Sequence, residues 1–261
     1  MLISDSELYE RGIATLLACF DANARGALDA RVLRSPGVTS AVFPVAPERE
    51  FFNNAVLEIG MGAAARARAI RSMEADYAGA GVTEFAAWVH ETDTDLQAEL
   101  TDRGYTLNES TLAMGMALDE LPAELPPLDL APPDWDEYAR LLELPGFLAQ
   151  GGHDAFHVQI ARLDGESVAQ AMAFDHEGDT GIFNVGTAEH ARRRGLSSAL
   201  MAHALRDAAS RGSTTATLQS TPMAEGVYAS VGFRPLARIL EFVPASNPAA
   251  GGSCPVDIPN F

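Results

Sequence analysis

The sequence predicts an α/β (α+β) protein that contains two similar halves. Runs of apolar residues typical of strands alternate with amphipathic runs typical of helices. Residues 52–56 (FNNAV) resemble 183–187 (FNVGT), and residues 103–105 (RGY) resemble 231–233 (VGF). Phe52 lies 52 positions before Gly104, and Phe183 lies 49 positions before Gly232. The shared order and spacing favour two degenerate copies of one unit, although any α/β chain repeats strands and helices at such intervals.

The sequence of the first half, residues 1–118, predicts both helices and strands. Ser6 is a candidate cap for the first amphipathic helix. An Ala- and Arg-rich helix ends at a cluster of glycines, and a shorter helix ends at Gly104. The expected helices are 6–24, 60–78 and 94–103, and the expected strands are 38–45, 50–57, 85–89 and 111–118.

A proline-rich linker, residues 119–133, separates this half from the next, because five prolines in so short a stretch cannot sustain a helix. Asp134 then caps a helix that runs to residue 144. Residues 145–154 contain three glycines and form a candidate substrate lid. Asp164-Gly165 predicts a tight hairpin. The expected strands are 156–163, 167–174, 182–187, 214–219 and 238–243, with a helix from 196 and a surface tail at 245–261.

Charge and composition narrow the class of protein. The formal net charge is -18, which argues against nucleic acid as a partner and suits a small cationic substrate. All eighteen basic residues are arginine, so any lysine target must belong to another molecule. No run approaches the ~20 apolar residues that a membrane span needs, and the first residues lack a basic segment ahead of an apolar one. We therefore expect a cytoplasmic protein with no membrane partner.

Cysteine and histidine give no pattern for a metal site. Cys19 and Cys254 are too far apart for a disulfide framework, and we expect two reduced thiols without a role. His153 and His157 lie four residues apart in a segment that reads as extended, with no cluster of other ligands nearby. We expect no metal.

The segment from 182 to 211 carries the clearest functional pattern. A short strand, 182–187, leads through the basic turn Arg192-Arg193-Arg194-Gly195 into a helix. The first amides of a helix have no intrahelical partner and the helix dipole favours an anion there, so this arrangement can hold phosphate. Gly195 lets the backbone approach a ligand closely. The alternative is a solvated helix start without a ligand.

The order of this segment resembles the GNAT (Gcn5-related N-acetyltransferase) family. The acetyl-CoA motif of that family, Gln/Arg-x-x-Gly-x-Gly/Ala, stands here as Arg192-x-x-Gly195-x-Ser197, with a serine in the last position. The later Tyr and Gly-Phe signature stands here as Tyr228 and Gly232-Phe233. The resemblance covers roughly residues 128–244. It implies tandem GNAT-like domains, each a mixed, mainly antiparallel sheet flanked by helices.

The same resemblance implies roles for individual residues. Acetyl-CoA would be the cosubstrate, bound by the domain at 134–244. Tyr228 would protonate the CoA thiolate, the alternative being a tyrosine that only packs beside the Gly-Phe turn. The expected cofactor-binding residues are Val185, Gly186 and Thr187 at the thioester, followed by Arg192, Arg193, Arg194, Gly195, Leu196, Ser197 and Ser198 at the pyrophosphate.

The general base stays open. Asn184 occupies the strand position where the family often has a carboxylate, and an amide cannot take a proton. Four local alternatives are Glu225, His157, Asp175 and His176, and a chain of water molecules is another.

In the first half, residues 58–62 (EIGMG) stand where the basic turn stands in the second. They supply glycines but no positive charge, so we expect residues 1–118 to be a degenerate GNAT-like domain without a CoA motif. The leading hypothesis is an N-acetyltransferase for a small, cationic amine, acting as a monomer or homodimer. The alternatives are a protein N-acetyltransferase and a non-catalytic acyl-CoA-binding module.

Overall fold

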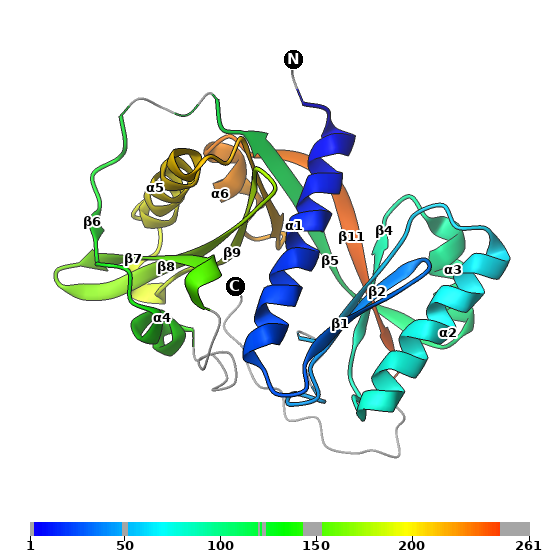
Figure 1. Cartoon of the computed structure of the whole chain (residues 1–261). Coiled ribbons are helices and arrows are strands. Elements are labelled where there is room, and N and C mark those ends of the chain that lie inside the picture. The colour runs from blue at the N-terminus through cyan, green and yellow to red at the C-terminus, as the bar shows by residue number, and fades with distance from the viewer. Residues whose placement is uncertain (1–2, 49–51, 120, 122–123, 143–152, 246–261) are drawn as a thin grey trace. The chain divides into compact units, whose positions relative to one another are not determined.

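The structure is a computed structural model that describes residues 3–48, 52–119, 121, 124–142 and 153–245 (Figure 1). The helices are α1 (Asp5–Gly26), α2 (Ala63–Ala80), α3 (Thr94–Asp102), α4 (Trp135–Leu141), α5 (Leu196–Arg211) and α6 (Glu225–Ser230). The strands are β1 (Arg31–Ser35), β2 (Val38–Val42), β3 (Asn54–Leu57), β4 (Ala86–His90), β5 (Tyr105–Ala117), β6 (Asp129–Leu130), β7 (Phe156–Leu163), β8 (Glu166–His176), β9 (Asp179–Thr187), β10 (Thr215–Ser220) and β11 (Arg234–Pro244). Two short 3₁₀ turns lie at His153–Ala155 and Glu189–Ala191.

The same series of elements occurs twice along the chain. In the first repeat, β1, β2 and β3 are antiparallel neighbours, α2 follows β3, and β4 returns parallel to β3. In the second repeat, β7, β8 and β9 are antiparallel, α5 follows β9, and β10 returns parallel to β9. Each repeat closes with a helix and one strand, α3 and β5 or α6 and β11. The expected fold class, two similar halves with mixed and mainly antiparallel sheets, is therefore confirmed.

Two compact units divide the chain differently from these repeats. The larger unit combines Met1–Leu28 with Thr111–Arg238, and the smaller unit combines Asp29–Ser110 with Ile239–Phe261. Within the larger unit, β5 pairs with β10, from Ala117 opposite Thr215 to Leu112 opposite Ser220. Within the smaller unit, β11 pairs with β4. Each unit therefore contains part of the last strand of the other repeat, because the boundaries of the units fall within β5 and β11.

The strand exchange gives the physical reason for this difference. The proline-rich segment marks a change in local composition, whereas strand pairing joins residues that are distant in the sequence. The assignment of residues 1–118 as a degenerate GNAT-like domain stays a prediction.

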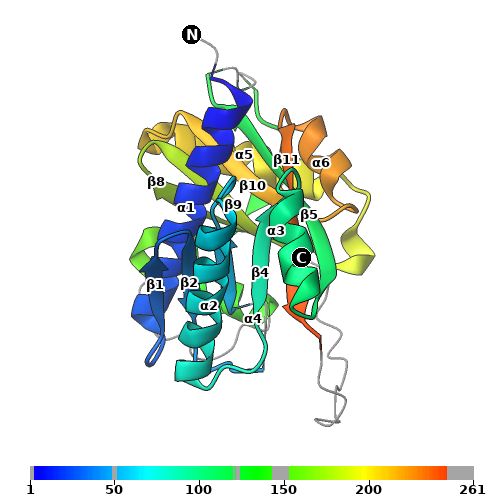
Figure 2. The same ribbon diagram turned by 90° about the vertical axis from the view of Figure 1, so that its right-hand side faces the viewer.

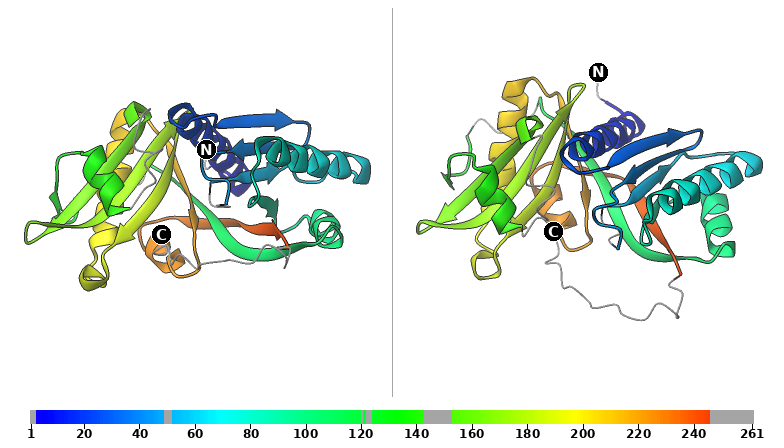
Figure 3. Two further views of the ribbon diagram at one scale, coloured as in Figure 1. Left: turned by 90° about the horizontal axis from the view of Figure 1, so that it is seen from below. Right: turned by 60° about the horizontal axis from the view of Figure 1, so that its bottom comes forward.

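In the larger unit, α1 and α5 cover opposite faces of the sheet (Figure 3). Strand β10 shows this alternation: Thr215 and Thr217 point to the side of α1, and Ala216 and Leu218 pack in the core that α5 covers. Gly12 allows α1 to lie close to the sheet, because a Cβ atom there would stand 3.1 Å from the Cβ of Thr217.

A buried carboxylate anchors α1 to this sheet. Asp179 is 1% exposed and accepts hydrogen bonds of 2.7 Å each from the hydroxyls of Thr15, Thr215 and Thr217. Thr15 lies on α1 and the other three residues lie on β9 and β10. Hydrogen bonds to a charged acceptor are stronger than neutral ones, so this cluster fixes the first helix to the second repeat.

The smaller unit has its own core, in which α2 lies along the strands of the first repeat (Figure 2). Ala69, Ile70, Met73 and Tyr77 are the residues of α2 that this core buries. The Tyr77 ring stacks on Phe85 at 4.2 Å between centroids, and its hydroxyl donates to the carbonyl of Ala41 at 3.1 Å.

Several local expectations need correction. The first helix begins one residue earlier than expected and its cap is Ser4, whose hydroxyl accepts from the Glu7 amide at 3.2 Å, and not Ser6. The strand expected at 111–118 is the second part of the longer β5. The sequence did not predict β1 or α6. The candidate lid at 145–154 lies almost wholly outside the described residues, as does the tail from residue 246 onward.

Candidate functional site

The parallel pair β9 and β10 stops pairing before either strand ends. The last matched residues are Ile182 and Leu218, whereas β9 continues to Thr187 and β10 to Ser220. The segment Phe183 to Thr187 of β9 therefore has no partner on β10 in the described chain. Its backbone donors and acceptors on that side form no ladder with β10, which leaves room for an extended ligand to pair there.

A β-bulge lies just beyond this point. Met172 of β8 is opposite Phe183, and Gln170 is opposite Gly186, so β9 has one more residue than β8 between the two pairs. Asn184 has a φ of 53°, in the left-handed region that asparagine tolerates better than most residues. Within the described chain, neither Asn184 nor Val185 has a partner in the ladder with β8 or β10.

A buried tyrosine holds the side chain of the bulge residue. The Nδ2 atom of Asn184 donates to the hydroxyl oxygen of Tyr138 on α4 at 3.0 Å, and Tyr138 is 0% exposed. Burial raises the pKa of Tyr138, so the phenol is neutral at physiological pH. The predicted cap of α4 is confirmed, since Asp134 accepts from the Glu137 amide at 3.0 Å.

The basic turn after β9 presents unused amides. Arg193 has a φ of 63° and Gly195 a φ of 77°, so the turn contains two left-handed residues. Gly195 caps α5 without a side-chain hydrogen bond, and the first backbone bond of the helix joins the Ala199 amide to the Gly195 carbonyl. The amides of Leu196, Ser197 and Ser198 are therefore unused by the helix.

The side chains of the turn divide into two groups. Some stabilise the turn itself: the hydroxyls of Thr187 and Ser197 are 2.7 Å apart, and Arg192 Nε donates to the Thr187 carbonyl at 3.1 Å. Arg193 and Arg194 are exposed and form no ion pair with any residue that the structure describes. A Cβ added to Gly195 would meet open space, so the turn is accessible to a ligand.

The remaining predicted cofactor residues lie in the same region. Val185 packs against the apolar cluster that contains Tyr228, and Leu196 packs beside Leu200 while its amide stays at the start of the helix. Gly186 lies directly against the side chain of Gln170, which a Cβ atom would displace. The structure thus brings the predicted residues together, and their roles in binding stay predictions.

Tyr228 lies on α6 with its ring in the core of the larger unit. It is 7% exposed, and its ring meets Phe233 edge-on at 6.2 Å between centroids. Burial raises the pKa of Tyr228 to about 12, which keeps the phenol protonated at neutral pH. In the described chain, no residue forms a hydrogen bond with its hydroxyl. The phenol is therefore available as a donor.

The four candidate bases are less well placed. The Glu225 carboxylate pairs with Arg238 at 3.0 Å. His176 and Asp175 face Asp179 and Thr180 at the start of β9, several residues before the bulge. These positions depend on strand register, which local sequence patterns do not specify.

His157 and Asp175 belong to an ionic cluster with Arg211. His157 Nε2 lies 3.5 Å from Asp175, which also accepts from Arg211 Nε at 2.6 Å and from the Thr180 hydroxyl at 2.7 Å. Burial opposes ionisation of Asp175, but the hydrogen bonds from Arg211 and Thr180 outweigh it and lower the pKa. Burial and the Arg211 charge lower the pKa of His157. Ion pairing explains these shifts without a catalytic role.

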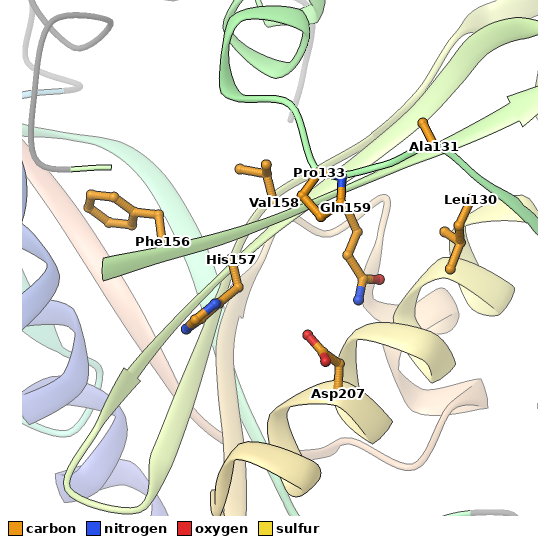
Figure 4. Close-up of a pocket in the computed structure, with 8 residues that line it drawn as sticks. All are labelled: Leu130, Ala131, Pro133, Phe156, His157, Val158, Gln159 and Asp207. Atoms are coloured by element: carbon orange, nitrogen blue, oxygen red, sulfur yellow. The ribbon is translucent and has the colours of Figure 1, made fainter. Parts of the chain in front are cut away.

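A hollow of about 300 Å³ lies beside this cluster, between β7 and the last part of α5 (Figure 4). Figure 4 shows His157 and Gln159 on the side of β7 that faces α5, and Asp207 pointing from α5 toward Gln159. Asp207 also pairs with Arg211, which offsets its charge. Asp207 is two helical turns or more beyond Ser198, so this hollow is separate from the basic turn.

The loop that corresponds to the basic turn in the first repeat hydrogen-bonds to side chains of its own unit. The Gly60 amide donates to Asp93 Oδ2 at 2.9 Å, and Asp93 Oδ1 caps α3 by accepting from the Leu96 amide at 3.1 Å. Arg66 donates to the Met61 carbonyl at 2.7 Å. A carboxylate of the chain itself therefore accepts from this loop, whereas the Ala63 and Ala64 amides at the start of α2 are not used by the helix.

Other classes of site receive no support in the part of the chain that is described. No group of three or more metal-ligating side chains occurs there. No helix there is long and apolar enough to cross a membrane. Cys19 is a free, buried thiol whose pKa burial raises to about 12, and Cys254 lies outside the described residues.

Comparison with known proteins identifies the class to which this fold belongs. Residues 116–233 match the model of the acetyltransferase (GNAT) family, and the chain therefore contains a GNAT domain. A search of curated proteins finds no match.

Solved structures extend the likeness to both repeats. A GCN5-related N-acetyltransferase from Kribbella flavida is 20% identical, with a TM-score of 0.68 over 90% of this chain and 97% of that one. A tandem GNAT protein from the clavulanic acid biosynthesis pathway is 15% identical, with a TM-score of 0.56 over 90% and 94%. A Staphylococcus epidermidis protein described as functionally unknown is 12% identical, with a TM-score of 0.63 over 84% and 95%. At these identities the likeness shows a tandem GNAT fold.

Proposed function

We propose that the protein transfers the acetyl group of acetyl-CoA to the primary amine of a small acceptor. The observation that carries this proposal is the continuity of two binding features in the GNAT domain. An unpaired stretch of β9 suits the extended pantetheine arm, and the amides at the start of α5 suit the pyrophosphate. Arg193 and Arg194 add positive charge at the second feature, in a chain whose net charge is strongly negative.

The chemistry requires one bond to form and one to break. The neutral amine nitrogen attacks the thioester carbon, an amide of the bulge at Asn184 and Val185 stabilises the oxyanion, and the C–S bond then breaks. Tyr228 donates its proton to the departing thiolate, and the proton lost by the amine leaves through water. Asn184 cannot accept this proton, and the other candidate bases are paired or distant.

The acceptor is proposed by class only. The net charge of -18 favours a cationic amine through electrostatic steering. The absence of lysine from the sequence means that acetylation of a lysine side chain would need a second protein. The cytoplasmic location and the state as monomer or homodimer stay predictions.

The test is isothermal titration of the full chain with acetyl-CoA, with adenine nucleotides as partial ligands. We expect one site per chain. Replacing both Arg193 and Arg194 with Ala should weaken binding about tenfold or more and reduce its salt dependence, because two charges near the phosphates are lost. The matched control replaces Arg68 and Arg71, two exposed arginines of α2, and should bind as wild type does. Equal affinity in both double variants would refute the phosphate assignment.

A second candidate is a non-catalytic acyl-CoA-binding module. Two observations favour it: Glu225 and Asp175 are engaged in ion pairs, and the side chain at the bulge is an amide, which cannot accept a proton. Release of free CoA thiol in the presence of a panel of small amines distinguishes the two functions. Acetyl-CoA binding without any amine-dependent thiol release would favour the module.

A further inference from the structure

We propose that Tyr138 is a positioning residue that sets the geometry of the thioester site through Asn184. The proposal rests on the proposed function, and Tyr138 itself does not touch the ligand. It acts by fixing the bulge of β9, whose free amides would receive the carbonyl oxygen of the acetyl group.

The first step of the argument is that the bulge needs a restraint. Asn184 is left-handed, and residues 184 and 185 lie outside both neighbouring ladders. A left-handed residue other than glycine is held by its surroundings, because its conformation is intrinsically less favourable. The described chain gives the Asn184 side chain one hydrogen bond, the 3.0 Å bond to Tyr138.

The second step is that Tyr138 is itself fixed. It is fully buried, and the Trp135 ring lies 5.3 Å from its own between centroids. The neighbouring Glu137 ties α4 to the hairpin of β7 and β8, since it accepts from the Ser167 hydroxyl at 2.6 Å and from Arg162 at 3.4 Å. The phenol oxygen therefore offers a stationary acceptor to the bulge.

The third step is that this contact acts at the point where the strands part. Pairing with β10 ends at Ile182, two residues before Asn184. A shift of the bulge would change the direction of the nearby amides without altering the turn that starts at Arg192. Loss of the contact should therefore affect recognition of the acetyl carbonyl and spare recognition of the phosphates.

The test compares two ligands, acetyl-CoA and S-ethyl-CoA, a thioether that lacks the carbonyl oxygen. We expect wild type to bind acetyl-CoA more tightly than S-ethyl-CoA. In Tyr138→Phe the ratio of the two affinities should be about three- to tenfold smaller, the range for one hydrogen bond. Affinity for S-ethyl-CoA should change by no more than about twofold. The ratio of the two affinities is the readout, because a general loss of stability lowers both.

Two further variants keep the test decisive. Asn184→Gly accepts the left-handed conformation but lacks the amide, and should lose the same preference even if Tyr138→Phe folds poorly. Tyr77→Phe removes a buried phenol with a hydrogen bond in the smaller unit, and should lower stability while leaving the ratio unchanged. The double variant Tyr138→Phe with Asn184→Gly should lose no more than either single change.

The outcomes separate this inference from the proposed function. Wild-type protein that binds neither ligand refutes both. Binding of both ligands without a preference leaves CoA binding standing and overturns the role of the bulge. A preference that survives Tyr138→Phe and Asn184→Gly overturns the role of Tyr138 alone.

Discussion

The two repeats use the same series of strand, loop and helix, but the two loops differ in their hydrogen bonds and in their charged side chains. Residues 58–62 enter α2 with the Gly60 amide bonded to Asp93 and with Arg66 bonded to the Met61 carbonyl. The turn at Arg192–Gly195 enters α5 with Arg193 and Arg194 unpaired in the described chain and with the first helical amides unused. Both helices leave their first amides unused, but only the first loop has a carboxylate of the chain bonded to it, and only the second has two exposed arginines.

This difference agrees with the proposal that the second turn binds a ligand and that the first is structural. Both loops contain a left-handed glycine, Gly60 with a φ of 75° and Gly195 with a φ of 77°. Glycine content is therefore shared, and the charge of the side chains at the loop differs. An internal carboxylate stabilises one loop, whereas the other should gain stability from an external anion.

The largest expected effect comes from giving the second loop a carboxylate of its own. Ser198→Asp places an acid in the first turn of α5, where it should weaken acetyl-CoA binding about 100-fold through repulsion and competition for the amides. The same change should raise the unfolding free energy by up to about 1 kcal/mol. Titration and thermal unfolding measure the two effects.

The control for charge is Ser210→Asp, at the exposed far end of the same helix. It should leave acetyl-CoA affinity within about twofold of wild type, since exposed charges separated by more than the Debye length are largely screened. A similar loss of binding in both variants would mean that net charge, and not the turn, controls affinity.

Removal of the internal carboxylate tests the first loop. Asp93→Ala leaves the Gly60 and Leu96 amides without their acceptor, so we expect a loss of about 2 kcal/mol in unfolding free energy, measured by chemical denaturation. Acetyl-CoA should still bind once per chain, because the loop has no counterpart of Arg193 and Arg194. A second bound equivalent would contradict the prediction that the first repeat is degenerate.

Asp179 is a second buried carboxylate to compare with Asp93. It holds the helix α1, whereas Asp93 holds a loop. Thr15→Val removes one of three hydroxyl donors with little change in shape, and should cost about 1–2 kcal/mol of unfolding free energy. Thr214→Val removes an exposed hydroxyl that donates to the Gly178 carbonyl at 3.1 Å, and should cost less than about 0.5 kcal/mol. Equal losses would show that α1 is not anchored through Asp179.

The smallest expected effect is the change in the free energy of unfolding at alkaline pH. Burial raises the pKa of Tyr228 to about 12 in the larger unit, and the pKa of Tyr105 rises through burial and the nearby Glu74 in the smaller one. Because the folded pKa exceeds the unfolded value near 10, this stabilisation is complete below pH 10 and is lost as the pH rises toward the folded pKa. Denaturation between pH 8 and pH 11.5 should show falling stability, with a shallower fall in Tyr228→Phe. An identical slope would contradict the shift.

The sequence was sufficient for features that depend on neighbouring residues. The hairpin at Asp164-Gly165 is confirmed, with both residues left-handed, and the helix after Gly195 begins at Leu196 as expected. Turn residues and helix caps act over a few positions, so their patterns are legible in one chain. The short helix α6 was missed, because its six residues include Gly226 and span too few turns to show a period.

Features that depend on distant residues were not predictable. The contact of Asn184 with Tyr138 joins residues 46 positions apart and depends on a bulge that only the pairing register reveals. The sequence marked Asn184 only as a residue that cannot serve as a base. The one available signal was an asparagine within a strand, where this residue is depleted.

The exchange of β5 and β11 has a consequence for how the chain acquires its structure. The hydrogen bond of Thr15 to Asp179 joins residues 164 positions apart, and Val89 of β4 pairs with the distant Leu240 of β11. Neither contact can form before the later residue has been synthesised. Loop closure over such separations is entropically costly, so we expect slow folding. We also expect few folding intermediates in which all strands of a sheet are paired. During synthesis the first repeat would stay incomplete until the last strand leaves the ribosome. The first repeat is thus needed whether or not it binds CoA, because its strand β5 pairs with β10 and covers an edge of the sheet of the second repeat.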